Sequence, residues 1–95
     1  MQIVEHLVVV SSPIGGDQVE TTFIRESTAA SARRAGARVF LGDGMRRVTY
    51  SNVTSSTLRV GQDGQEVTLE PILLNTGENS DELAADLQFA GWRQA

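Results

Sequence analysis

The pattern of apolar and polar residues predicts two extended segments near the N-terminus, joined by a turn. Residues 3–10 are rich in β-branched side chains, and the run 7–10 is too continuously apolar for an edge strand with one face in water. We expect this strand to be buried on both sides or covered by a helix. Residues 11–17 contain Pro13 and two adjacent glycines, which favour a turn. Residues 19–26 alternate and run back antiparallel, so the pattern predicts a hairpin.

Residues 27–41 have the spacing of an amphipathic helix. Small and apolar residues recur there at intervals of three and four, and Ser27 is a candidate N-cap. Gly36 costs about 1 kcal/mol relative to alanine inside a helix, so an alternative ends the helix there and makes residues 37–41 a strand. The glycines in the turn 42–44 give a clearer C-terminal stop, and we therefore prefer the longer helix. Its predicted apolar stripe consists of Ala29, Ala32, Gly36, Val39 and Phe40.

The second half of the chain predicts further strands and one more helix. Residues 45–50 alternate with period two, and residues 57–60 and 66–74 are two more strand candidates. Between those candidates lies an Asp-Gly pair, Asp63 and Gly64, of the kind that favours a tight hairpin. Pro71 cannot donate a hydrogen bond, so its part of the strand should lie at an edge or a bulge.

A final helix is expected to begin at Ser80, where two carboxylates follow in the first turn. Phe89 and Trp92 do not fall squarely on its apolar stripe, so at least one of them should be exposed or wrap around the sheet edge. The element order β-β-α-β-β-β-α predicts one α+β domain over residues 1–95. We expect an antiparallel sheet of four to five strands with two helices on one face.

Length and composition exclude several classes of protein. The chain has 95 residues, no cysteine and one histidine, which argues against disulfide scaffolds, zinc ribbons and thiol nucleophiles. The residues at the start lack the basic region of a secretory signal, and no apolar run is long enough to span a membrane. We therefore expect a cytoplasmic protein of a bacterial host.

The candidate chemistry gives little support to an enzyme. His6 is the first residue to test as an acid or base, but the adjacent Glu5 points to the opposite face of a strand and cannot orient it. Asp43 and Asp63 stand beside glycines, where aspartate is favoured by backbone geometry alone. No spacing matches a calcium loop or a phosphate cradle. We expect no catalytic residues, no metal and no cofactor.

Charge is distributed unevenly along the chain. From position 25 to position 59, seven arginines stand against two acids, whereas seven acids stand against one arginine from position 60 to the end. The acidic part could present a negative surface to a basic partner, with aromatic residues near the C-terminus as anchors. The candidate residues of that surface are Glu66, Glu70, Glu78, Asp81, Glu82 and Asp86, with Phe89 and Trp92 as the aromatics.

The arginines suggest a different surface, which could contact phosphates. Its candidates are Arg33, Arg34 and Arg38 on the expected helix and Arg46 and Arg47 on the strand after it. The acidic net charge and the few aromatic residues make direct nucleic-acid binding the weaker alternative.

Small size, acidity, lack of cysteine and this element order together resemble phage-borne anti-CRISPR proteins. The strand 19–26, the Ala-rich segment closing on Gly42-Asp43-Gly44 and the strands after it carry the resemblance. It implies a stoichiometric inhibitor that binds a subunit of an RNA-guided surveillance complex and blocks DNA access through acidic and aromatic residues. The first alternative is a phage or mobile-element assembly protein that associates with itself through strand edges, for instance as a homodimer. The second is a nucleic-acid binder that uses the arginines.

Overall fold

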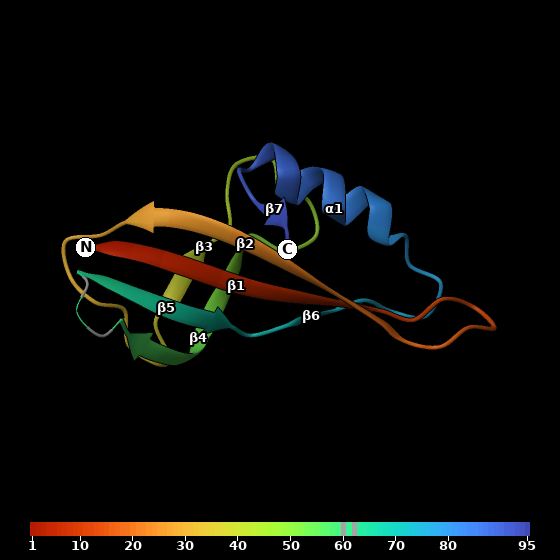
Figure 1. The fold of residues 1–95 in the computed structure, drawn as a ribbon. Coiled ribbons are helices and arrows are strands. Elements are labelled where there is room, and N and C mark those ends of the chain that lie inside the picture. Colours follow the sequence, from red (N-terminus) through yellow and green to blue (C-terminus); the bar gives the residue numbers. More distant parts are fainter. Residues whose placement is uncertain (60, 62) are drawn as a thin grey trace.

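The fold is mostly β-structure, seen in a computed structural model that describes residues 1–59, 61 and 63–95 (Figure 1). About 45% of the chain is in strands and 11% in helix, so the prediction of an α+β fold with two helices is wrong. The elements in chain order are β1 (Gln2–Ser11), β2 (Val19–Thr28), β3 (Arg38–Phe40), β4 (Tyr50–Leu58), β5 (Gly64–Leu69), β6 (Ile72–Leu73), α1 (Ser80–Phe89) and β7 (Arg93–Gln94).

The strands form one mixed sheet in the order β3-β4-β5-β1-β2-β7, with β6 beside β1. β1 pairs antiparallel with β2 and parallel with both β5 and β6, so the expected antiparallel sheet is also wrong in part. The sheet curls, and in Figure 1 β3 and β4 cross behind the long β1–β2 hairpin. β1 therefore lies at the centre of the sheet, with β2 on one side and β5 and β6 on the other, as its continuous apolar run predicts.

The N-terminal hairpin is confirmed. β1 and β2 pair along their full lengths, and Leu7 lies opposite Phe23. Alternate side chains of β1 point into the core, where Ile3 and Leu7 are fully buried. On the opposite face of β1 burial is less complete, because Val8 and Val10 are only half-buried. The expected burial on both sides thus holds strictly for one face of the strand.

The predicted helix over residues 27–41 is wrong. β2 continues to Thr28, the following residues form no helix, and β3 then begins at Arg38. Gly36 has a φ of +87°, in the left-handed region that glycine adopts without strain and that a helix interior excludes. The alternative of a strand after Gly36 is therefore closer to the structure. Val39 and Leu41 are buried while Phe40 between them is exposed, which is the alternation of a strand.

The predicted strand boundaries in the second half also shift. Residues 45–49 form no strand, and β4 begins only at Tyr50, so the strand predicted over 45–50 is wrong. The strand candidate 57–60 corresponds to the end of β4, which stops at Leu58. Val60, the last residue of that candidate, and Gln62 in the expected hairpin turn lie outside the described residues. The candidate 66–74 divides into β5 and β6 around Pro71, as a residue without an N–H requires.

The final helix is confirmed at its predicted start. α1 begins at Ser80, but its N-cap is Asn79, whose side-chain oxygen accepts from the backbone N–H of Asp81 at 2.9 Å. Leu83 and Leu87 are buried against the core. The helix lies along the β2 and β7 side of the sheet in Figure 1. One face of α1 is therefore fixed by the core, and the other is exposed.

Candidate interaction surfaces

A buried carboxylate holds two arginines that are themselves only partly exposed, at 16% for Arg25 and 26% for Arg33. Glu5 is fully buried; its carboxylate accepts from the Arg25 Nε at 2.8 Å and lies 3.7 Å from an Arg33 nitrogen. Arg25 also donates to the backbone carbonyls of Phe40 and Leu41, each at 2.8 Å. These contacts connect the hairpin to the segments on either side of β3. Arg33 is thus turned toward Glu5, and 26% of its side chain stays exposed.

The other predicted arginine pair, Arg46 and Arg47, forms ion pairs with acids in α1 and just before it. Arg46 contacts Glu82 at 2.8 Å and Asp86 at 2.9 Å, and Arg47 forms an ion pair with Glu78. The loop between β3 and β4 is thereby held against the helix. Three of the predicted acidic-surface residues are thus partly neutralised by two residues of the predicted arginine surface. The two groups were expected on separate surfaces, whereas the fold brings them together.

Arg46 controls the ionisation of Asp86. Its guanidinium donates to the carboxylate and holds the pKa of Asp86 below the ordinary value. Because the folded-state pKa is the lower one, the stabilisation is complete above the unfolded pKa and is lost as the pH falls through the folded value. We predict that Arg46→Ala raises the pKa of Asp86 toward that of a free aspartate, measured by carboxyl carbon NMR during an acid titration. An unchanged titration midpoint would show that the ion pair does not form in solution.

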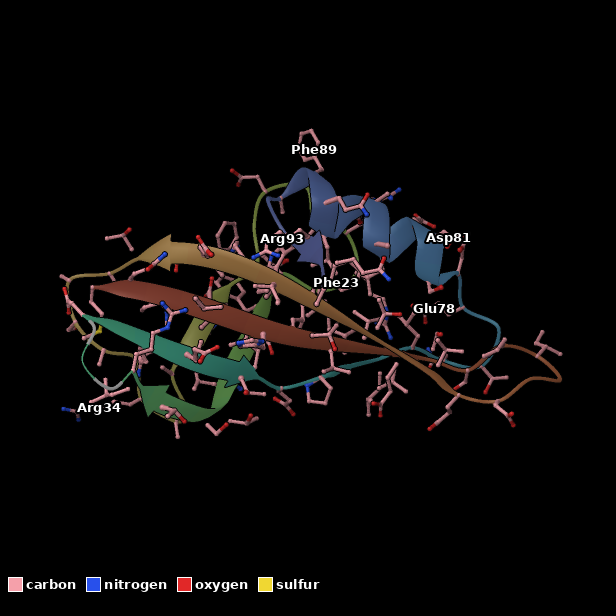
Figure 2. All side chains as sticks on the ribbon, in the orientation of Figure 1. Phe23, Arg34, Glu78, Asp81, Phe89 and Arg93 are labelled. Carbon is pink, nitrogen blue, oxygen red and sulfur yellow. The ribbon has the colours of Figure 1, made fainter. Side chains whose placement is uncertain are left out.

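The outward face of α1 carries exposed acids and an exposed aromatic ring. Asp81 and Glu82 are exposed in the first turn, and Phe89 at the end of the helix has 83% of its surface exposed. Figure 2 shows the Phe89 ring projecting away from the sheet. Successive turns of a helix place residues seven apart on one side, so Glu82 and Phe89 share a face. We call Asp81, Glu82, Ala85, Gln88 and Phe89 the helix surface.

The remaining predicted acidic residues lie elsewhere. Glu66 lies on the outward face of β5, where its carboxylate oxygen is 3.0 Å from the Nε2 of His6. Glu70 is exposed beyond the end of β5. Trp92 is 2% exposed and donates its indole N–H to the Leu41 carbonyl at 2.9 Å, so it presents no ring to a partner. The predicted acidic and aromatic residues therefore do not form a single face, and Phe89 is the exposed one of the two predicted aromatics.

His6 has a partner that the sequence analysis missed. A histidine–carboxylate pair can hold and pass a proton. The His6 and Glu66 side chains are 31% and 49% exposed, however, so the pair lies at the solvent and not in an enclosed substrate site. β1 and β5 are parallel neighbours, and their register places Glu66 opposite Val4, two residues before His6 on β1. A predicted parallel pairing of these strands would have been the signal needed to find the pair.

A second group of exposed side chains lies where β3 pairs with β4. Phe40 lies opposite Tyr50 in the register, their ring centroids are 5.5 Å apart, and both residues are 44% exposed. The Arg38 guanidinium stacks over the Tyr50 ring at 3.8 Å from its centroid. Arg34 is exposed in the turn before β3. The five predicted phosphate-binding arginines are thus scattered over several environments and form no common stripe.

The described residues contain no group of three or more histidine and carboxylate side chains placed to hold a metal ion. Among them there is also no helix long and apolar enough to cross a membrane. Comparisons of the chain with protein-family models, with curated proteins and with solved structures found no match. Function must therefore be inferred from the surfaces themselves.

Proposed function

We propose that the chain is a non-enzymatic protein-binding module that contacts its partner through the helix surface. The observation that carries the proposal is the 83% exposure of Phe89 on the outward side of α1. Transfer of a phenylalanine side chain from water into an apolar pocket contributes about 1.5–3 kcal/mol. Aromatic residues that are exposed in the free protein and buried in the complex commonly dominate the binding energy of an interface.

The charges around Phe89 favour a basic partner. Asp81 and Glu82 are exposed on the same helix, and Asp86 lies beside Glu82 at the Arg46 guanidinium. Carboxylates at the rim of an interface steer a basic protein into contact and exclude acidic ones. Asp81 is an exposed carboxylate, whereas Glu82 and Asp86 are partly neutralised by Arg46. An aromatic anchor with these neighbours suits a groove that is apolar at its centre and weakly basic at its edges.

The most specific form of the proposal is an inhibitor of the anti-CRISPR type, encoded by a phage or mobile element. Its target would be a basic protein that handles nucleic acid, such as a subunit of an RNA-guided surveillance complex. Small size, net negative charge and absence of cysteine support this class. The helix over residues 27–41, which contributed to the resemblance, is absent from the fold. The support therefore comes from composition and from the helix surface, and not from the element order.

The first test replaces Phe89 by serine and uses an equally exposed residue as the control. Ile14, in the turn between β1 and β2, is also 83% exposed, so Ile14→Ser removes a comparable apolar side chain from a different element. Tagged variants would be used to capture partners from a nuclease-treated bacterial lysate, with quantitative mass spectrometry. We expect Phe89→Ser to reduce the retained partner about tenfold or more and Ile14→Ser to leave it unchanged. Equal retention by the two variants would contradict the assignment of the helix surface.

The inhibitor form needs a separate measurement. Purified surveillance complexes would be mixed with the protein, and DNA binding would be followed by gel mobility. An inhibitor should abolish the shift at a stoichiometric ratio, and Phe89→Ser should restore it. The contrary outcome is that DNA binding stays undiminished for every complex tested while the lysate yields a partner of another kind. That result would support the binding-module proposal and contradict its inhibitor form.

A further inference from the structure

The outer edge of β4 has no pairing strand over its second half. β4 runs from Tyr50 to Leu58, but β3 pairs only with residues 50–52. On its other side β4 pairs with β5 as far as Leu58. In the part of the chain that the structure describes, no strand pairs with residues 54–58 on the outer side. All five of these residues are exposed, so neither a helix nor a loop covers the edge.

The hydrogen-bond register shows which amides point toward this edge. The backbone N–H of Arg59 donates to the Gly64 carbonyl at 3.0 Å, next to the Leu58–Gln65 pair. Bonded and non-bonded pairs alternate in an antiparallel ladder, so the next bonded pair is Thr57 with Glu66. The N–H and C=O groups of Ser56 and Leu58 therefore point away from β5. They are a ready template for another strand.

Features that normally block strand addition are lacking here. The sequence of residues 54–58 is Thr-Ser-Ser-Thr-Leu, with no proline and no charged side chain. Natural proteins usually protect such edges with charges, proline or a covering segment. The edge of β3 is protected in this way, because Arg25 donates to the outward carbonyl of Phe40. The outer edge of β4 is thus exposed next to a β3 edge that is protected.

An arginine lies near each end of this edge. Gly36 donates to the Val53 carbonyl at 2.7 Å, which places the turn containing Arg34 at one end, and Arg59 follows Leu58 at the other. Neither arginine has a carboxylate within ion-pair distance among the described residues. A second copy added antiparallel would bring its Arg59 next to Arg34, which is unfavourable. An acidic strand would pair with both.

We propose that the outer edge of β4 binds an extended, acidic segment of a partner protein by β-strand addition. This site is separate from the helix surface and has the opposite charge preference. Backbone hydrogen bonds to Ser56 and Leu58 would supply affinity, and Arg34 and Arg59 would select carboxylates. The chain then has two surfaces, one for a basic groove and one for an acidic strand.

The test uses a short capped peptide that alternates glutamate and valine, with a matched peptide of lysine and valine. Binding would be followed by amide chemical shifts and hydrogen exchange of the full-length protein. With the acidic peptide in excess, exchange of the Ser56 and Leu58 amides should slow by about tenfold. The lysine peptide should bind at least about fivefold more weakly. Unchanged exchange at both amides, or shifts centred on another element, would overturn the proposal.

Variants separate the edge from the general fold. Ser56→Pro removes an outward N–H without removing a bond to β5, and should abolish peptide protection of Leu58. Ser56→Ala keeps the N–H and should bind as the unchanged protein does. Arg34→Glu should remove the preference for the acidic peptide. Phe89→Ser should leave peptide binding intact, which distinguishes this site from the helix surface. Concentration-dependent dimerisation abolished by Ser56→Pro would assign the edge to a second copy and overturn the proposed partner.

Discussion

Replacing Glu5 by alanine should lower the free energy of unfolding by about 3–5 kcal/mol, because it leaves buried arginine charge without its partner. The Glu5 side chain is fully buried, and Arg25 contacts it at 2.8 Å and 3.3 Å. The Arg25 side chain is itself only 16% exposed, so water cannot replace the lost carboxylate without rearrangement. The loss would be measured by urea denaturation followed by circular dichroism. It is a large fraction of the stability of a domain of this size.

Two controls distinguish the ion pair from general packing. Glu66→Ala removes an exposed carboxylate from the same sheet and should change stability by no more than about 0.5 kcal/mol. The double variant Glu5→Ala/Arg25→Ala should be less destabilised than the sum of the single variants, because the second change removes the unpaired charge. Strictly additive effects would show that Glu5 and Arg25 do not interact in solution.

The parts of the fold that the sequence predicted correctly are those with local signals. The turn at residues 11–17 and the strands beside it are contiguous, so the hairpin needs no information from distant residues. The start of α1 is similarly marked by the acids at positions 81 and 82. The exposure of Phe89 was also predictable, because the ring lies off the apolar stripe of its helix. Each of these features depends on residues that lie close together in the sequence.

The prediction of a helix over residues 27–41 was wrong because the predicted apolar stripe consisted largely of alanine and glycine. Ala29, Ala32 and Gly36 have little apolar surface, so their spacing says little about which side is buried. The stronger signal was the alternation around Val39, which was hidden because the exposed neighbour is Phe40, an apolar residue. Phe40 is tolerated at the surface by packing against Tyr50, ten residues away. A single-sequence pattern does not contain that contact.

The ion pair between Glu5 and Arg25 follows from the register of the β1–β2 hairpin, which was not used to predict contacts from the sequence. Once the hairpin is predicted, pairing about its turn places Glu5 opposite Arg25, and that pair could have been found. The contacts of Arg46 with α1 are different, because they join a loop to a helix more than thirty residues later in the chain. Arg47 forms an ion pair with Glu78, just before that helix. No local pattern predicts such a contact. The acidic surface was therefore overestimated from the sequence, since the neutralising arginines were assigned to another face.

Replacing Trp92 by alanine should destabilise the protein by about 3–5 kcal/mol and loosen the C-terminal end from the sheet. Trp92 is 2% exposed, its indole N–H donates to the Leu41 carbonyl at 2.9 Å, and the Arg25 guanidinium stacks 4.4 Å from its ring centroid. The same side chain therefore closes the core and covers the charge network. Its removal should expose the Leu41 carbonyl and admit water to Arg25. Urea denaturation would give the total loss, and hydrogen exchange of β7 would locate it.

Trp92→Phe separates the two roles of this residue. Phenylalanine keeps part of the apolar area but cannot donate to Leu41, so a loss of about 1–3 kcal/mol is expected, smaller than for alanine. If the hydrogen bond holds the segment after β3 in place, Trp92→Phe should speed exchange near Leu41 more than in β1. If Trp92→Phe lost as much stability as Trp92→Ala, the hydrogen bond, and not the buried ring area, would dominate the contribution of Trp92. Uniform exchange changes across the sheet would contradict a local role, since Trp92 would then act only through global stability.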